Sequence, residues 1–308
     1  MTVPQALVNR WGRGIVIQLE VHAAEWFSSG LAHEFNDVRR LVQRPSDMPP
    51  PKIALRTRSL RMPLRKALMA AADLGVSGVE LDVRSEIPYR DFTQTAIRQL
   101  RTQLADMRLT VSALTFVTRR GYNVMEELDR RVEATRQVMK LARALGTDIV
   151  VNQIGLIPEA ADSTDRALLL EVLRDLGNYG QHAGALLCAE TGSEAGPALR
   201  KLLDELPQGA LGVALNPGQL VVNGFDPQEA ASTLAPFVRH VYAIDGVRDR
   251  ARGRGTEVRL GRGSVDFPAV FAALGECDYR GSVTVAPVDA EEPVHEAQQA
   301  VSYLNNLW

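Results

Sequence analysis

The sequence contains little cysteine, and this shortage bears on both stability and metal binding. Its 308 residues include two cysteines, Cys188 and Cys277, which stand far apart and show no spacing typical of a metal site. A disulfide-stabilised scaffold is therefore not expected, and the composition is typical of a reducing compartment. We expect a cytoplasmic protein.

The chain also lacks an excess of charge of either sign. Its 35 lysines and arginines stand against 37 aspartates and glutamates, which gives a formal net charge of -2. Proteins that bind nucleic acids need a positive surface for the phosphate backbone. We therefore expect no nucleic-acid partner, whereas small anionic ligands are compatible with this composition.

Long apolar runs are absent as well. No stretch reaches the about eighteen apolar residues that a membrane-spanning helix needs, so no membrane association is expected. Gln18 and Glu20 interrupt the apolar run GIVIQLEVHAA, which is therefore not expected to be a signal peptide. The prolines of PSDMPPPKI mark a boundary. We expect residues 1–50 to form an N-terminal extension, poorly ordered or peripheral, with Met48 as a candidate alternative start.

The remaining chain, residues 51–308, alternates short apolar runs with longer segments of helical periodicity. This alternation is typical of βα units around a parallel sheet. The predicted strands are KIALRT from Lys52, GVELDV from Gly78, TVSALTF from Thr110, DIVVNQIG from Asp148, ALLCAETG from Ala185, LGVALN from Leu211, RHVYAID from Arg239 and GSVTVAP from Gly281.

The helical segments between these strands carry their own start and stop signals. The first has an apolar face and ends at Gly75. The third is predicted to begin with Asn123 as its N-terminal cap and Glu126 as the reciprocal partner, and to end at Gly146. Eight βα units in about 250 residues match a single-domain (β/α)8 TIM barrel. A doubly wound sheet is the alternative, but RTRSLRMP after the first strand is not its glycine-rich fingerprint.

In such a barrel the chemistry lies at the carboxyl ends of the strands. The residues there are Arg56, Glu80, Asp82, Thr115, Asn152, Gln153, Glu190, Asn216, Gln219, Tyr242, Asp245 and Ala286. Polar groups at strand ends often only solvate the rim, and we interpret Arg56 and Thr115 in that way. Glu80 and Asp82 share one strand face, where they either orient a ligand or pair with Arg56 or Arg84.

Glu190 is the strongest functional candidate of this set. It closes the apolar run ALLCAE, where a partly desolvated carboxylate either finds a partner or takes part in chemistry. Asn216 precedes Pro217 and serves either the turn or a ligand. Tyr242 is a candidate sugar contact, and His240, one layer deeper on the same face, is interpreted as a core histidine.

From Lys52 to the C-terminus the chain resembles the xylose isomerase-like TIM barrels, a family of sugar phosphate isomerases and epimerases. The resemblance rests on PLRKALMAAADLGVSGVELDV, on ALLCAETG and, most specifically, on LGRGSVDFPAVFAALGECDYRGSVTV. It covers nearly the whole barrel. The related endonuclease branch needs a three-zinc cluster, which the five scattered histidines of this chain are not expected to build.

Members of this family typically hold one divalent metal through Glu, Asp, His and Glu on strands five to eight. The resemblance places these positions at Glu190, Asn216, Tyr242 and Ala286, so one ligand is kept and three are replaced. GVALNPGQ resembles the family's Asp-Pro-Gly-His turn with Asn216 and Gln219 in place of the acid and the imidazole. We expect a degenerate site without a cofactor. Weak binding of Mn²⁺, Mg²⁺, Co²⁺ or Zn²⁺ at Glu190 is the alternative.

The resemblance implies a sugar, polyol or sugar-acid ligand at the strand ends. We expect Glu190 to be the catalytic residue, and the expected substrate contacts are Glu80, Asn216, Gln219, Tyr242 and Arg248. Metal-dependent catalysis is expected to be lost or altered. Two alternatives stay open: an active isomerase or epimerase with a metal site rebuilt around Glu190, and a non-catalytic scaffold. A homo-oligomer is also open, since Leu307 and Trp308 either close the barrel floor or meet a partner subunit.

Overall fold

Parallel strands close into a barrel in the computed structural model, which describes residues 51–308 apart from 91, 161, 250–254, 288–289 and 308. The barrel strands are β1 (Lys52–Arg56), β2 (Gly78–Asp82), β3 (Thr110–Thr115), β4 (Ile149–Asn152), β5 (Leu186–Glu190), β6 (Gly212–Leu215), β7 (Val238–Ala243) and β10 (Ser282–Val285). They follow the chain order around the barrel, and β10 pairs with β1 to close it. All eight predicted strands and the (β/α)8 fold are confirmed. The extension expected over residues 1–50 lies outside the described residues.

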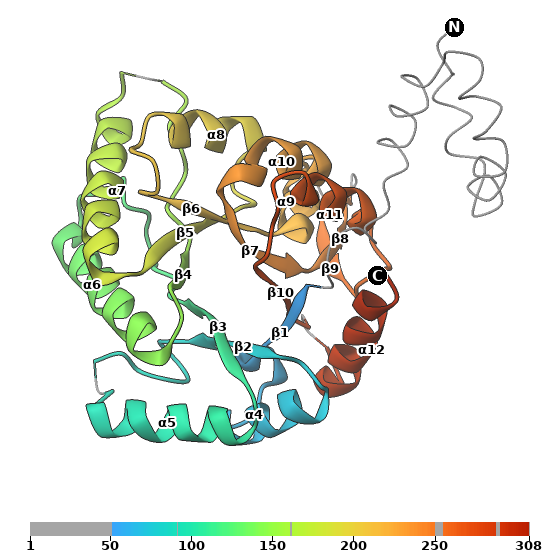
Figure 1. Ribbon diagram of the computed structural model, residues 1–308. Coiled ribbons are helices and arrows are strands. Elements are labelled where there is room, and N and C mark those ends of the chain that lie inside the picture. The colour runs from blue at the N-terminus through green and yellow to red at the C-terminus, as the bar shows by residue number, and fades with distance from the viewer. Residues whose placement is uncertain (1–50, 91, 161, 250–254, 288–289, 308) are drawn as a thin grey trace, which may run out of the picture. The chain divides into compact units, whose positions relative to one another are not determined.

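Helices surround the strands, as the view down the barrel in Figure 1 shows. They are α4 (Leu64–Asp73), α5 (Gln94–Asp106), α6 (Leu128–Leu145), α7 (Thr164–Ala183), α8 (Gly196–Asp204), α9 (Pro217–Asn223), α10 (Pro227–Leu234), α11 (Phe267–Gly275) and α12 (Pro293–Asn305), with 3₁₀ helices η2 (Thr57–Leu60) and η3 (Ala235–Phe237). The predicted stops hold at Gly75 and Gly146, both of which adopt the left-handed conformation. In the part of the chain that the structure describes, no helix is long and apolar enough to cross a membrane.

Two local predictions are wrong. Helix α6 begins at Leu128 with Glu127 in the cap position, and Asn123 instead donates to the carbonyl of Leu156. The guanidinium of Arg131 in the first turn bonds to the main-chain oxygens of Val124 and Glu126, which holds the preceding loop outside the helix. The predicted seventh strand also ends early, because Asp245 opens a short antiparallel ribbon of β8 (Asp245–Val247) and β9 (Thr256–Val258).

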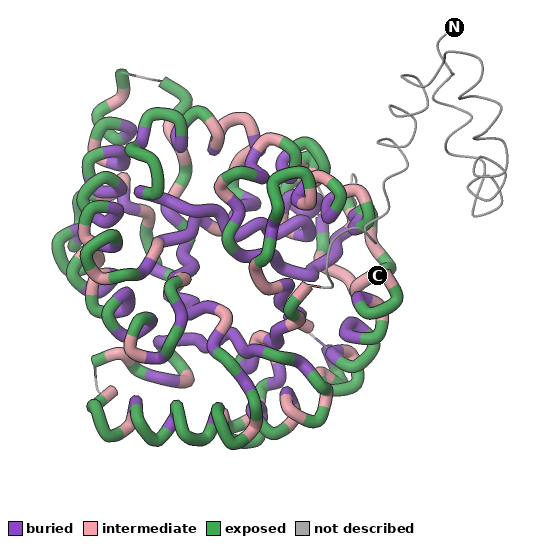
Figure 2. The backbone as a smooth tube through the Cα atoms, in the orientation of Figure 1, coloured by how far each residue is buried: buried purple, intermediate pink, exposed green. Residues whose placement is uncertain are grey.

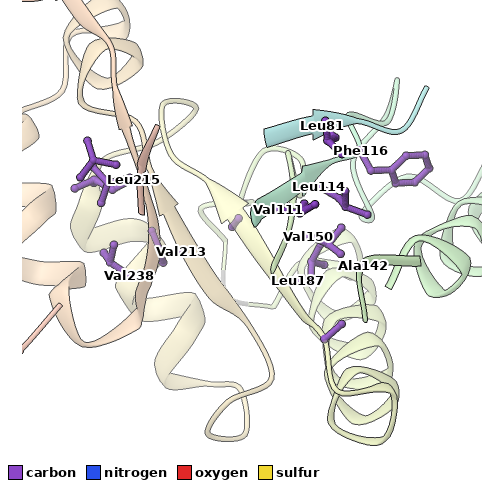
Figure 3. Close-up of a cluster of buried hydrophobic side chains, with 14 of the residues drawn as sticks. Leu81, Val111, Leu114, Phe116, Ala142, Val150, Leu187, Val213, Leu215 and Val238 are labelled. Atoms are coloured by element: carbon purple, nitrogen blue, oxygen red, sulfur yellow. The ribbon is translucent and has the colours of Figure 1, made fainter. Parts of the chain in front are cut away.

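Successive side chains along each strand point alternately outward, toward the helices, and inward, into the barrel. The strands therefore separate two buried layers. Figure 2 shows buried chain along the strands and exposed chain on the outer faces of the helices. Aliphatic side chains such as Leu114, Val150 and Leu187 point outward and lie near Ala142 of α6 (Figure 3). The barrel interior holds a second cluster, which includes Ala113, Val151, Cys188, Ala214, Tyr242 and Ala286. The residues one step further along the same inner faces therefore emerge at the carboxyl ends of the strands.

Candidate functional site

The inner faces of several strands open into a cavity of about 340 Å³, which we call the mouth pocket. Its floor and walls carry Arg56, Glu80, Asp82, Thr115, Glu190 and Glu257. Arg58 and Arg61, from η2 and the residue that follows it, also line this pocket. The pocket is therefore built mainly from charged side chains on β1, η2, β2, β5 and β9, and β3 contributes Thr115.

Glu80 is the centre of a buried network in this pocket. Arg56 Nε and Thr115 Oγ1 each donate to Glu80 Oε1 over 2.6 Å, and His240 Nε2 donates to Oε2 over 3.0 Å. Burial by itself would raise the pKa of Glu80, but Arg56, His240 and Thr115 outweigh burial and hold this pKa well below its usual range. Glu80 is therefore ionised at neutral pH and holds its neighbours by hydrogen bonds. Of the two roles open for it, the pairing with Arg56 is observed.

Glu190 stands in a different environment at the end of β5. Its Oε1 accepts a hydrogen bond from Asn216 Nδ2 over 2.8 Å. Burial raises its pKa, and the carboxylates of Glu80 and Glu257 add to this effect, whereas Arg56 and Asn216 oppose it. The pKa of Glu190 is thus raised, whereas that of Glu80 is lowered.

Asn216 and Gln219 are held by structural contacts. Asn216 Oδ1 accepts from the main-chain nitrogen of Gln219 over 3.1 Å, so Asn216 caps helix α9. Its amide nitrogen meanwhile donates to Glu190. Gln219 Nε2 donates to Glu257 Oε1 and so connects α9 to β9. Both side chains lie beside the pocket and orient its carboxylates.

Tyr242 is fully buried in the barrel interior, on the same inner face as His240. The two rings meet edge to face with their centroids 4.9 Å apart, and the guanidinium carbon of Arg56 lies 4.5 Å from the Tyr242 ring centroid. Its buried hydroxyl makes no hydrogen bond of ordinary geometry. Burial, followed by the negative charge of Glu80, holds the pKa of Tyr242 well above its usual range, so the phenol is neutral.

Of two other predicted residues, Asp82 lines the mouth pocket, whereas Arg248 is not part of its lining. Arg248 is exposed and its guanidinium lies against Gly224 at the end of α9. Its role in substrate binding stays a prediction. Asp82 pairs with Arg58 over 2.7 Å and accepts from the main chain of Arg84, so its side-chain partner is Arg58 and not Arg84.

The most specific part of the family resemblance has a structural explanation. The Asp245 carboxylate accepts four main-chain hydrogen bonds, from Gly246, Gly261, Gly263 and Val265, over 2.8 to 3.1 Å. A side chain at position 263 would collide with this carboxylate, so glycine is required there. Asp245 thus anchors the loop between β9 and α11 on the mouth side of the barrel.

Sequence reasoning missed several residues of the pocket. Arg56 was interpreted as a rim residue, yet it bonds to Glu80 and stacks on Tyr242. Glu257 belongs to a ribbon that was not predicted, and Arg58 and Arg61 follow a strand end without forming a motif. Their position in the sequence was an available signal, because η2 directly follows β1 and so places its side chains over the mouth pocket.

Comparison with known proteins agrees with this architecture. The family model described as the xylose isomerase-like TIM barrel matches residues 68–307, which is more than half of the chain. The chain belongs to this family. No curated protein matches it.

Solved structures show the same fold at low sequence identity. A xylose isomerase domain protein from Planctomyces limnophilus is 24% identical, with a TM-score of 0.71 over 78% of this chain and 91% of that one. A xylose isomerase-like TIM barrel protein from Mycobacterium smegmatis in complex with magnesium is 18% identical, with a TM-score of 0.67 over 86% and 98%. A D-psicose 3-epimerase from Clostridium cellulolyticum is 13% identical, with a TM-score of 0.66 over 83% and 99%.

The side chains at the family's four metal positions do not fit a divalent cation. The carboxylate of Glu190 faces the amide nitrogen of Asn216, whose oxygen is engaged by the cap of α9. Tyr242 is a neutral phenol, and Ala286, buried in the same cluster, offers no donor atom. Within the described residues, no three histidine, cysteine or acidic side chains are grouped as a metal ion would require. Weak metal binding at Glu190 is tested below.

Proposed function

We propose that the mouth pocket binds a small polyhydroxylated carboxylate, a sugar acid, and that the metal-dependent chemistry of the family is lost or altered in it. The position of Arg56 carries this proposal. Its guanidinium bonds to Glu80, covers the Tyr242 ring, and acts by its charge on Glu190. The positively charged guanidinium of Arg56 therefore lies among side chains from the strands that carry the family's metal ligands.

The remaining charges support a ligand with both hydroxyl and carboxylate groups. Carboxylate oxygens such as those of Glu190 accept hydrogen bonds from sugar hydroxyls. At the edge of the pocket, Arg61 is exposed and makes no ion pair with the part of the chain that the structure describes. An arginine fork binds a carboxylate in bidentate fashion. We assign the ligand's hydroxyls to the Glu190 side and its carboxylate to Arg61.

Any turnover in this pocket would use Glu190 as a single base. It would take the proton from a carbon next to the ligand's carbonyl, and the electron pair of that C–H bond would move into the carbonyl to form an enediolate. Arg56 stabilises the resulting negative charge. Glu190 returns the proton to the former carbonyl carbon, while the hydroxyl proton on the first carbon passes to the former carbonyl oxygen, so that the first carbon becomes the new carbonyl. Because Ala286 supplies no base on the opposite face, this route shifts a carbonyl without inverting a carbon, which favours isomerisation over epimerisation.

Calorimetric titration of chelator-treated protein with glucuronate tests the binding step. We expect binding without added metal, no binding of the uncharged polyol glucitol, and about tenfold weaker binding after Arg61→Gln, because one charged hydrogen-bond donor is lost. Arg101→Gln, an exposed arginine of α5, is the matched control and should bind normally. Glucuronate and galacturonate that bind only with Mn²⁺, or not at all, would contradict the proposal.

Proton transfer is measured separately by NMR in deuterated water. We expect the bound sugar acid to acquire deuterium at the carbon next to its carbonyl, and Glu190→Gln to abolish this exchange while binding persists. Binding without exchange in the unsubstituted protein would mean that the ligand is held without conversion.

A further inference from the structure

A second, larger cavity of about 750 Å³ lies beside the mouth pocket, between the loops after β2 and β3 and the start of α6. Its lining includes six arginines: Arg84, Arg90, Arg119, Arg120, Arg130 and Arg131. We call it the arginine cavity. The chain beyond β3 separates the two spaces, because Thr115 and Val117 line the mouth pocket whereas Phe116 and Thr118 line the arginine cavity.

The arginine cavity carries more positive charge than its own residues neutralise. Arg120 pairs with Glu126 over 2.6 Å, and Arg130 pairs with Glu127 over 3.0 Å. These are the acidic residues of the lining. Arg84 and Arg119 have no ion pair with any described residue, although the whole chain has a formal net charge of -2. The positive charge of the cavity is therefore a local feature of the chain.

Aromatic residues hold two of these arginines and use only one of their hydrogen-bond donors, Arg90 Nε, which donates to the Tyr89 hydroxyl over 3.1 Å. The guanidinium carbon of Arg84 lies 4.8 Å from the Phe116 ring centroid, and that of Arg90 lies 5.6 Å from the Tyr89 centroid. The two rings pack edge to face, with centroids 5.4 Å apart. The rings engage the faces of the guanidinium groups, so most of the N–H groups at their edges stay available for an anion.

The start of α6 adds two further features. The cap residue Glu127 has a left-handed backbone, with φ of 53°, and its side chain makes no capping hydrogen bond. Arg131 Nε is buried without a hydrogen-bond partner among the residues that the structure describes, while its terminal nitrogens fix the loop before the helix. Burial and the charge of Arg120 lower the pKa of Arg131, whereas Tyr122 raises it. A bound anion would relieve this repulsion and meet the positive end of the helix.

We propose that the arginine cavity binds a small polyanion, a ligand that carries two or more phosphate or carboxylate groups. The volume of the cavity suits a small molecule. Its unpaired guanidinium groups match oxyanions with planar or forked geometry. A nucleic acid is the less favoured occupant, because the balanced charge of the chain provides no excess of basic residues for a long phosphate backbone. The site does not depend on the function proposed for the mouth pocket.

Calorimetric titration of the full chain with inorganic pyrophosphate and with citrate tests this assignment at low ionic strength. We expect at least one of them to bind, and the double variant Arg84→Gln, Arg119→Gln to weaken that binding by about tenfold or more. Both arginines are exposed, so the variant should fold, and its melting temperature checks this. Arg101→Gln on α5 removes an equally exposed arginine outside both cavities and should leave the binding unchanged.

Each outcome of these titrations either supports or overturns the proposed polyanion site. Pyrophosphate binding that the double variant loses supports a phosphorylated ligand, and tighter citrate binding under the same test supports a polycarboxylate. Absence of binding by both probes, or an equal loss in Arg101→Gln, would overturn the proposal. A short DNA duplex that binds more tightly than either probe and depends on Arg84 and Arg119 would overturn it in favour of a nucleic acid.

Discussion

The mouth pocket includes residues at the ends of β2 and β3, and the arginine cavity lies between the loops that follow these strands, yet the two spaces differ in how their charges are paired. In the mouth pocket, Arg56 pairs with the buried Glu80, and Arg58 pairs with Asp82. In the arginine cavity, Arg84 and Arg119 have no acidic partner among the described residues. The mouth pocket is thus largely balanced by the protein itself, whereas the arginine cavity is suited to charge supplied by a ligand.

This difference predicts how each region responds to the loss of a charge. Removing one member of a buried, bonded pair leaves the other uncompensated and costs stability. Removing a charge that repels its neighbours costs little. Stability measurements on single substitutions therefore separate the two arrangements, and the following predictions run from the largest expected effect to the smallest.

The largest effect is expected from Glu80→Gln. The substitution keeps the shape of the side chain but leaves Arg56 and His240 without the buried anion that both contact. We expect the free energy of unfolding, measured with urea, to fall by about 3 kcal/mol. Asp204→Asn removes an exposed partner of Arg200 on α8 and serves as the control, with an expected loss below about 1 kcal/mol. Equal losses in the two variants would mean that the Glu80 network does not stabilise the barrel.

The same network predicts a dependence on pH. Because the pKa of Glu80 is lowered in the folded protein, its contribution to stability is fully present above the unfolded pKa, about 4.3, and is lost as the pH falls toward the folded value. The stability difference between the unsubstituted protein and Glu80→Gln should therefore shrink below about pH 4.3. Urea unfolding at a series of pH values measures it. A difference that stays constant down to pH about 3 would contradict the ionised state of Glu80.

Glu190→Gln should not lower the free energy of unfolding as Glu80→Gln does. Burial raises the pKa of Glu190, so the ionised carboxylate at neutral pH costs stability that a neutral amide does not. Gln can still accept the bond from Asn216. We expect the free energy of unfolding at neutral pH to stay unchanged or rise by less than about 1 kcal/mol, and the difference to vanish at low pH. A clear loss of stability at neutral pH would show that Glu190 is structural in the same sense as Glu80.

Metal titration completes the comparison of the two carboxylates. With Mn²⁺, Co²⁺ or Zn²⁺ added to chelator-treated protein, we expect no specific binding at the strand ends. Arg56 opposes a second cation there, and Ala286 supplies no ligand. Calorimetry alongside Glu190→Gln measures this. Micromolar binding that this substitution abolishes would show a metal site rebuilt around Glu190.

Much of the fold could be predicted from the sequence, because a parallel barrel buries both faces of its strands. Each strand is therefore a short apolar run between polar helices, and all eight runs were recognisable. The β8–β9 ribbon was missed because its strands have three residues each and carry no alternation. The start of α6 was misplaced because Arg131 holds the preceding loop by contacts that the local capping pattern does not reveal.

The site was less accessible from the sequence. Glu190 could be placed because it closes an apolar run, and Tyr242 because it follows His240 by two residues on the same strand face. The role of Arg56 depends on the register that sets Arg56 opposite Glu80, and register between distant strands is not written in either segment. The arginine cavity could not be predicted from the sequence for a different reason. Its arginines come from three separate segments, and their charge disappears in the balanced total of the chain.

The smallest effect on stability is expected from the double variant Arg84→Gln, Arg119→Gln without any ligand. Neither arginine has an ion pair with a described residue to lose, and each stands near others of the same charge. We expect the free energy of unfolding to change by less than about 0.5 kcal/mol, with any gain confined to low salt, because screening removes repulsion between exposed charges. Pyrophosphate, if it binds, should then stabilise the unsubstituted protein more than the variant. A large loss of stability without ligand would mean that these arginines serve the fold and that the two cavities differ less than their ion pairs indicate.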